Sequence, residues 1–225
     1  MRKLLNIWNW PDGTAWRWLL ATGKRLRDQR FKWFMTQFAP EQTTRVLDVG
    51  VTAESAGTSN FFEKKYPFPQ SLTACGVENK PAICQQLGIE FVQADGRELP
   101  FDDASFDIAH SNAVIEHVGS RDQQSRFVAE LCRVAKRVYI STPNKLSPIE
   151  THTLIPCAHW LPRRACWWIY RKLGREYYAS QDTLNLISAS QLVKLFPENL
   201  RTQVKIKRQF LWGMPVIITA WLDRE

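Results

Sequence analysis

Acidic, glycine and small polar residues follow each of the first four short apolar runs in this 225-residue chain. These residues are Asp48, Gly50 and Thr52, then Glu78 and Asn79, then Asp95 and Gly96, and finally Ser111 and Asn112. If the apolar runs are parallel strands, their carboxyl ends meet at one edge of a sheet, which is where open α/β sheets bind ligands. Three carboxylates at that edge favour a ligand with cationic groups over one with phosphates.

The loop after the first run does not fit a nicotinamide dinucleotide. Dinucleotide binding requires the spacing G-x-G-x-x-G, which lets the backbone approach a pyrophosphate. The chain has Gly50 but places Thr52 and Ser55 at the next two glycine positions, and Glu54 adds a negative charge. A nicotinamide-dependent oxidoreductase is therefore the weaker alternative.

Glu78 is the strongest single candidate for a cofactor contact, because an acidic residue at the end of a second strand accepts hydrogen bonds from both ribose hydroxyls. It follows Gly50 by 28 residues, more than the usual ~20, and the proline-containing stretch 66–71 accounts for the excess. Asp48 and Asp95 each have a structural alternative, in which the carboxylate bonds the backbone of its own loop, as in an Asx-turn.

The elements that must position these residues alternate between strand and helix. Apolar runs predict strands at 45–50, 72–77, 90–93, 106–111 and 137–141, and helical periodicity predicts helices at 60–66 and 123–135. This order predicts parallel strands joined by right-handed crossovers, in an α/β sheet that helices cover on both faces.

Further elements flank this region. Amphipathic spacing predicts a long or broken helix at 14–38, and further patterns predict a Trp-rich helical segment within 159–178, a helix at 190–196 and a strand pair at 203–210 and 215–222. We expect a single domain over 1–225. It would comprise an N-terminal helical extension (1–40), a cofactor-binding core (43–145), a cap or acceptor region (146–190) and a C-terminal helix and strand pair (191–225).

Four ordered motifs give the chain a resemblance to a known family. They are VLDVG at 46–50, GVE at 76–78, FVQADGRELPF at 91–101 and SFDIAHSNAVIEHV at 105–118. Over about residues 43–145, the chain resembles the class I methyltransferases of the type 11 group, which use S-adenosylmethionine. The resemblance implies a Rossmann-like, doubly wound sheet of seven strands with the last antiparallel, flanked by helices.

The resemblance also implies residue roles. It implies that Gly50 lets the backbone approach the methionine part of the cofactor, that Glu78 binds the ribose, and that Asp95 faces the adenine amine. The family usually has further glycines where this chain has Thr52 and Glu54. The complete predicted cofactor set is Asp48, Gly50, Thr52, Glu78, Asn79, Asp95, Gly96, Ser111 and Asn112, the last two at the methyl-transfer site.

Two histidines are the candidates for catalysis. Methyl transfer by in-line displacement mostly requires alignment, and a general base is needed only if an acceptor hydroxyl or amine must lose a proton. His117 follows the fourth strand, and His152 follows the fifth, where an acceptor would enter. His159 is a further candidate base, and a capping or packing role is the structural alternative for all three.

Positive charge and tryptophan gather at both ends of the chain. Residues 1–34 carry a net charge of +6, residues 35–159 of −4 and residues 160–225 of +6, and all ten tryptophans lie in the two basic parts. The mixture of indole rings with Lys and Arg at 160–175 suits a solvated cap, and it also suits an anionic membrane surface or a lipid-linked acceptor. Nucleic acid is disfavoured as a partner, because no RNA-binding module or N-P-P-Y pattern occurs. We expect a small-molecule, glycan or lipid-linked acceptor.

Composition and spacing argue against several other classes of protein. The chain is 44% hydrophobic and 23% charged, as ordinary globular proteins are. No run approaches the ~18 to 20 apolar residues of a membrane-spanning helix. Asn6, Asn9 and Pro11 interrupt the apolar start of the chain, which argues against a signal peptide. We therefore expect a cytoplasmic protein, peripheral to the inner face of a membrane if the cap binds lipid.

The five cysteines and four histidines show no metal-ligand spacing, so the sequence predicts no metal site. A non-catalytic binding protein, which kept the sheet and lost the cofactor through its altered first loop, is the rival from another class.

Overall fold

The computed structural model describes residues 14–53, 59–79 and 81–224. The chain forms two compact units, Met1–Glu41 and Gln42–Glu225, and each is described by itself. The apolar start of the chain and Glu54 lie outside the described residues, as do the inferences drawn from them above.

The first unit contains the helix α1, Thr14–Phe38, which confirms the helix predicted from amphipathic spacing. Near its end the rings of Phe34 and Phe38 stack with centroids 5.0 Å apart. Ala39 adopts a positive φ of 39°, and Pro40 follows directly, so the helix ends just before a proline that could not continue it.

The second unit is built on a seven-stranded sheet with the order β3-β2-β1-β4-β5-β7-β6. Strands β1 to β5 pair in parallel, whereas β7 runs antiparallel to both of its neighbours. This confirms the predicted Rossmann-like fold with an antiparallel last strand. The strands are β1 Val46–Val49, β2 Leu72–Gly76, β3 Glu90–Gln93, β4 Phe106–Asn112, β5 Ala135–Pro143, β6 Lys205–Leu211 and β7 Met214–Asp223.

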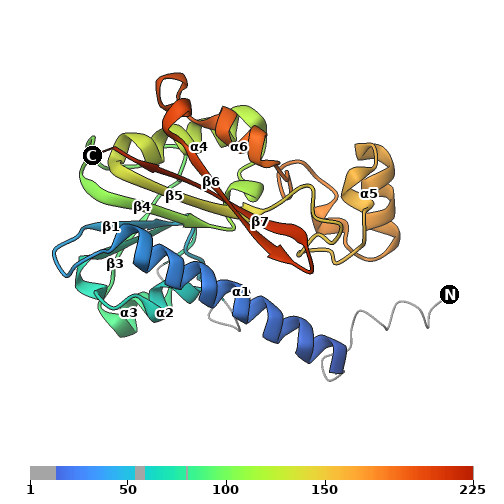
Figure 1. Ribbon diagram of the computed structural model, residues 1–225, viewed down its shortest axis with the longest axis horizontal. Coiled ribbons are helices and arrows are strands. Elements are labelled where there is room, and N and C mark those ends of the chain that lie inside the picture. The colour runs from blue at the N-terminus through green and yellow to red at the C-terminus, as the bar shows by residue number, and fades with distance from the viewer. Residues whose placement is uncertain (1–13, 54–58, 80, 225) are drawn as a thin grey trace. The chain divides into compact units, whose positions relative to one another are not determined.

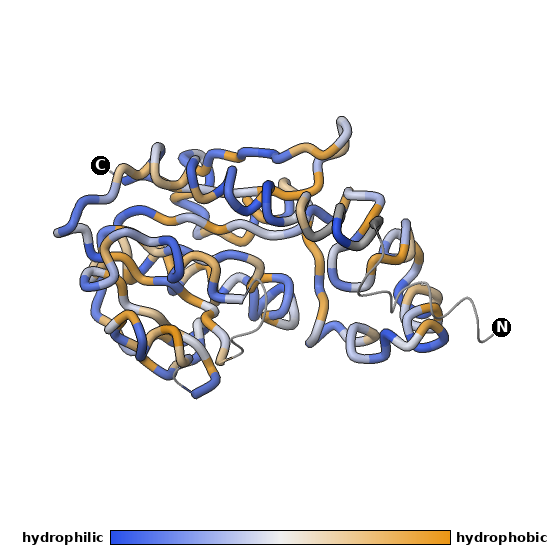
Figure 2. Tube along the Cα trace, turned by 90° about the horizontal axis from the view of Figure 1, so that it is seen from below, coloured by the Kyte–Doolittle hydropathy of each residue, from blue (hydrophilic) through white to orange (hydrophobic). Residues whose placement is uncertain are grey.

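Helices flank this sheet, and α4 and α6 lie side by side along one face of it (Figure 1). Both begin with a capping box, in which Ser120 or Ser188 accepts from the amide three residues later. Hydrophilic and hydrophobic residues alternate along the helices, as expected of helices with one buried face (Figure 2). The helices of this unit are α2 Phe61–Lys65, α3 Ala82–Leu87, α4 Arg121–Val134, α5 Arg163–Lys172 and α6 Ala189–Leu195.

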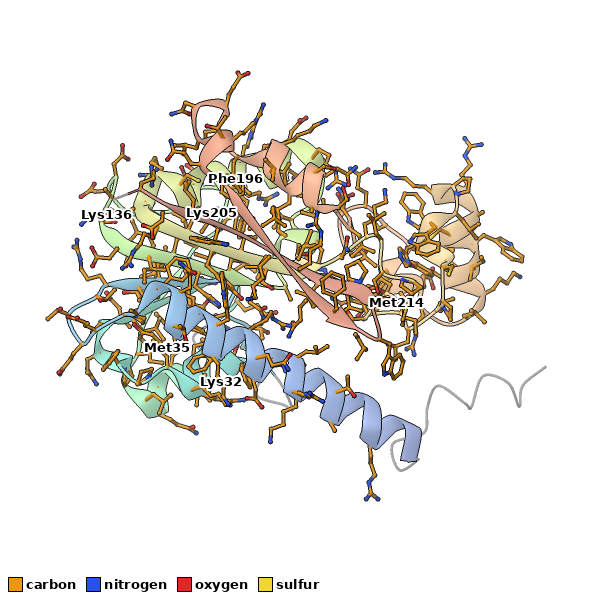
Figure 3. The ribbon with its side chains drawn as sticks, in the orientation of Figure 1. Lys32, Met35, Lys136, Phe196, Lys205 and Met214 are labelled. Carbon is orange, nitrogen blue, oxygen red and sulfur yellow. The ribbon has the colours of Figure 1, made fainter. Side chains whose placement is uncertain are left out.

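The core of the sheet is formed by its central strands and by the inner face of α4. Every residue of β1 and β2 is buried, which is why both read as short apolar runs rather than as alternating strands. On α4, Phe127, Val128 and Leu131 pack into the same apolar cluster. Lys205 and Met214 lie at opposite ends of the β6–β7 hairpin (Figure 3). In this hairpin, β6 forms the edge of the sheet opposite β3.

A separate cap follows β5 and contains α5, which lies to one side of the sheet in Figure 1. Its apolar cluster includes Ile155, Ala158, Cys166, Tyr170 and Ala179. Among the described residues, no helix is long and apolar enough to cross a membrane.

Candidate active site

The loop after β1 is held close to the end of β2. The amides of Gly50 and Val51 both donate to the carbonyl oxygen of Cys75, at 2.8 and 3.0 Å. Gly50 has a φ of 109°, and a Cβ there would lie 2.1 Å from a methyl carbon of Val114. A Cβ on Gly76 would lie equally close to the carbonyl oxygen of Val51. Both glycines are therefore required by close packing where the cofactor is predicted to bind.

Glu78 closes onto this loop. Its Oε2 accepts from the hydroxyl of Thr52 at 3.0 Å and from the amide of Ala53 at 2.7 Å. Asn60 fastens the same loop, because its side chain bonds both the amide and the carbonyl of Thr52. The structure thus brings together Thr52 and Glu78, which are far apart in sequence, on an exposed edge next to Asn79.

Asp95 forms the Asx-turn that was its structural alternative. Its Oδ1 accepts from the amide of Arg97 at 2.9 Å, and the Arg97 guanidinium also bonds the carboxylate. Hydrogen bonds from Arg97 hold the pKa of Asp95 below its usual value. Gly96 is buried, and a Cβ there would meet the ring of Phe127 at 2.5 Å. The turn therefore presents an ionised carboxylate at the end of β3, and its contact with adenine stays a prediction.

Ser111 and Asn112 end β4. The hydroxyl of Ser111 is buried and donates to the carbonyl oxygen of Val49 at 3.0 Å, so it ties β4 to β1. Asn112 is partly exposed at the strand end. Of the pair, Asn112 is better placed to meet a ligand.

Asp48 belongs to a buried cluster beneath this edge. Its Oδ1 lies 2.6 Å from Nδ1 of His110, whose ring stacks between those of Phe62 and Tyr139. Burial raises the pKa of Asp48 to about 7, and burial together with the Asp48 charge raises that of Glu63 to about 8. The sequence did not indicate this cluster. Its geometry accounts for Asp48 without a ligand, and a cofactor contact of Asp48 stays a prediction.

We expect this cluster to make the folded state less stable as the pH rises. Because the folded pKa values of Asp48 and Glu63 exceed the unfolded ones, the folded chain binds more protons between about pH 5 and 8, and this stabilisation is lost through that window. Denaturant unfolding at pH 5.5 and pH 8.5 should show Glu63→Gln reducing this loss by on the order of 2 kcal/mol. The matched variant of an exposed acid, Glu90→Gln, should leave it unchanged. Equal pH dependence in both variants would contradict the assignment.

The predicted catalytic histidines lie in contact, with their ring planes nearly perpendicular. His117 and His152 point their Nε2 atoms at each other across 3.1 Å. Nδ1 of His117 lies 2.6 Å from the carbonyl oxygen of Thr183, and Nδ1 of His152 contacts the carboxylate of Glu150. Burial alone would lower the pKa of His152, but its hydrogen bond with Glu150 leaves that pKa raised.

Two buried carboxylates that the sequence analysis did not select flank this pair. Glu150 accepts from the amides of His152 and Thr153, at 2.8 and 2.7 Å. Glu116 is fully buried, and its Oε2 accepts from Thr142 at 2.8 Å. Its Oε1 lies 4.0 Å from Nε2 of His152. Glu116 could have been selected from the sequence, because it directly precedes His117 after β4. No local feature of the sequence distinguished Glu150.

His159 does not join this group. Its Nε2 bonds the carbonyl oxygens of Lys145 and Ser147, at 3.1 and 2.8 Å, and burial lowers its pKa. A neutral histidine that donates to backbone carbonyls pins the chain after β5, which is the structural alternative considered for it.

Comparison with known sequences finds similarity to methyltransferases over part of the chain. The model of the methyltransferase domain matches residues 60–138. A proposed methyltransferase of Encephalitozoon cuniculi (strain GB-M1) is 36% identical over 99 residues, which are 42% of this chain and 46% of that protein. The match thus spans less than half the length of that relative.

Solved structures share the fold at low sequence identity. Geranyl diphosphate C-methyltransferase from Streptomyces coelicolor A3(2), solved with Mg²⁺, geranyl diphosphate and S-adenosyl-L-homocysteine, has a TM-score of 0.57 and 11% identity, covering 96% of this chain and 86% of that one. Magnesium protoporphyrin IX methyltransferase from Synechocystis PCC 6803, with bound S-adenosylhomocysteine, has a TM-score of 0.56 and 12% identity, covering 96% of this chain and 90% of that one. The [4+2]-cyclase SpnF has a TM-score of 0.50 and 15% identity, covering 80% of this chain and 59% of that one.

Proposed function

We propose that this protein transfers a methyl group from S-adenosylmethionine to a small-molecule acceptor, because a methyltransferase-domain family model matches residues 60–138. The observation that carries this proposal is the cradle at the end of β1 and β2. There, Glu78 lies over a loop whose close packing requires glycine at Gly50 and Gly76. An exposed carboxylate beside a closely packed backbone suits a nucleoside without phosphates.

In the proposed complex, the ribose hydroxyls replace Thr52 and the Ala53 amide as partners of Glu78. The sulfonium then lies near the ends of β1 and β4, close to Asn112. His117 and His152 act on the acceptor from the far side, by promoting the loss of its proton. In-line displacement needs the acceptor atom aligned with the methyl group, so the first task of the site is to position the two reactants.

A calorimetric titration with S-adenosylhomocysteine, with NADH in a parallel cell, tests the proposed cofactor. Micromolar binding of the first ligand alone is expected. Binding of NADH would instead support an oxidoreductase, and binding of neither would support the non-catalytic reading. Since the neighbours include a [4+2]-cyclase, methyl transfer itself requires a separate assay with labelled S-adenosylmethionine.

The cap supports a finer proposal, in which the acceptor is lipid-linked and the cap touches an anionic membrane. Trp168 on α5 is 60% exposed and Trp160 just before α5 is 50% exposed. Exposed basic residues of the same helix include Arg164 and Lys172. Indole rings beside basic side chains suit the interface and head groups of a bilayer.

We therefore expect the protein to sediment with vesicles that contain anionic lipid and not with neutral vesicles. Reversing the charge of two α5 residues, in R164E/K172E, should weaken this binding by about 10-fold or more, because each basic residue near such a surface contributes ~1 kcal/mol. The variant K194E/R208E makes the same charge change at exposed residues on α6 and β6. Equal loss in both variants would indicate only a general effect of net charge, and no vesicle binding would contradict the membrane contact.

A further inference from the structure

The histidine pair at the cap holds an electrostatic conflict. A carbonyl oxygen only accepts hydrogen bonds, so His117 must carry its proton on Nδ1, which faces the carbonyl of Thr183. His152 must do the same, because its Nδ1 contacts the Glu150 carboxylate, which two backbone amides also bond. The carboxylate of Glu150 accepts from the amides of His152 and Thr153, so it faces His152 as an acceptor.

Both Nε2 atoms are then without a proton in the neutral rings, and they point lone pairs at each other across 3.1 Å. Such an arrangement is repulsive unless a positive species lies between the nitrogens. One extra proton would serve, and so would a metal ion.

Glu116 favours the metal ion. Its side chain is fully buried, and its Oε1 has no hydrogen-bond partner among the described residues. A proton shared by the two histidines leaves this buried oxygen unsatisfied, which is costly. One cation can be coordinated by all three residues, since one ligand atom from each lies within 4.8 Å of the others. Nε2 of His152 lies 3.1 Å from Nε2 of His117 and 4.0 Å from Oε1 of Glu116.

We propose that Glu116, His117 and His152 form a binding site for a divalent transition-metal ion, with Zn²⁺ as the reference ion. Two imidazoles and a carboxylate are ligands that Zn²⁺ accepts. In a tetrahedral site with the usual Zn–N bond length, the two ligand nitrogens lie about 3.3 Å apart. The two Nε2 atoms lie 3.1 Å apart in the structure, which is close to that distance. Oε1 of Glu116 lies 4.0 Å from Nε2 of His152, so the Glu116 side chain must move toward the histidines to complete the set.

The partners behind these ligands support the assignment. Metal-binding histidines donate their other ring N–H to a carboxylate or a carbonyl, which fixes the ring and its tautomer. His152 has Glu150 in this role and His117 has Thr183, while Thr142 holds the second oxygen of Glu116. Each ligand is therefore oriented before any ion binds.

The catalytic role of this ion rests on the proposed methyl transfer. Three protein ligands leave at least one position open, as in catalytic rather than structural zinc sites. The ligands follow β4 and β5 at the edge where the acceptor would enter, so the open position would suit an acceptor hydroxyl. An ion held by Glu116, His117 and His152 would lower the pKa of that hydroxyl, and its proton would pass to water. The oxygen then forms a bond to the methyl carbon as the carbon–sulfur bond breaks, and the electron pair stays on sulfur.

Metal binding is tested on protein that has been stripped with a chelator and then titrated calorimetrically with ZnCl₂ at pH 7.5. We expect one Zn²⁺ ion per chain, with affinity reduced at least 10-fold in His152→Ala and in Glu116→Gln. Glu150→Gln, which changes an outer partner, should reduce affinity by about 10- to 100-fold. His159→Gln is the matched control, because that histidine bonds backbone carbonyls outside the group.

A parallel titration with S-adenosylhomocysteine separates the two proposals. Stripped protein that binds this ligand but takes up neither Zn²⁺, Mn²⁺ nor Fe²⁺ would overturn the metal site and leave the proposed function standing. Zinc binding that survives in His152→Ala, or that is lost equally in His159→Gln, would also overturn it. If Zn²⁺ binds and S-adenosylhomocysteine does not, the metal site stands and the proposed function falls. Retained S-adenosylhomocysteine binding in Glu116→Gln shows that this variant is folded.

Discussion

Replacing Glu78 by alanine is expected to weaken the binding of S-adenosylhomocysteine by about 10- to 150-fold, or roughly 1.5 to 3 kcal/mol, the range for lost charge-assisted hydrogen bonds. In the structure without ligand, the Glu78 carboxylate accepts from Thr52 and from the Ala53 amide, so it is already oriented over the first loop. The ribose hydroxyls would exchange with these partners. The hydrogen bonds that Glu78 gains from the ribose are partly offset by those it loses to Thr52 and Ala53. The expected loss of affinity therefore lies within this range rather than above it.

Two variants sharpen this test. Glu78→Gln keeps the size of the side chain but removes the charge, so its affinity for S-adenosylhomocysteine should lie between that of Glu78→Ala and that of the native protein. Glu90→Ala removes an exposed carboxylate at the start of β3, the opposite end of the strands, and should leave affinity unchanged. If Glu78→Ala binds as tightly as the native protein, Glu78 is not a cofactor ligand.

The fold could be predicted from local patterns because the parallel strands are buried on both faces. The runs around Val46–Val49 and Leu72–Gly76 lack polar alternation for that reason. Boundaries were less accurate where one element passes directly into another. The helix α4 ends at Val134 and β5 begins at Ala135, two residues before the predicted strand, because no turn residue separates them. The 3₁₀ segment Glu198–Gln203 likewise occupies the predicted start of the strand β6.

The cofactor edge was predictable for a topological reason. Residues that follow parallel strands meet at one edge wherever they stand in the sequence, and this rule brings Thr52 to Glu78. The strand ends do not tell which way a side chain turns. Ser111 turns inward to Val49, and Asp48 turns to His110, because buried polar groups must find partners in the core.

The ligand set at the cap was only half visible in the sequence. His117 and His152 were selected for their positions after strands, but their spacing of 35 residues follows no metal-binding pattern. Their partners come from other segments, since Thr142 reaches Glu116 across 26 residues and the Thr183 carbonyl reaches His117 across 66. Contacts that depend on how the cap folds back onto β4 and β5 leave no periodic trace.

Replacing His152 by alanine is expected to lower kcat for methyl transfer by about 10²- to 10⁴-fold, the range for a group that assists proton transfer. S-adenosylhomocysteine affinity should change little, because His152 lies at the cap and Glu78 at the end of β2. The same loss is expected whether His152 takes the acceptor proton itself or holds a metal ion that acidifies the acceptor.

Removing metal from the native protein distinguishes these two modes. If the ion acts, a chelator should abolish turnover and Zn²⁺ should restore it, whereas a histidine base would be indifferent to both. His159→Gln should retain turnover in either case, since His159 bonds the Lys145 and Ser147 carbonyls. Full activity of His152→Ala would remove the histidine pair from the mechanism and leave alignment by the cofactor edge as the source of catalysis. That outcome would fit an acceptor that has no proton to lose, because displacement at the methyl carbon then needs only the positioning of the two reactants.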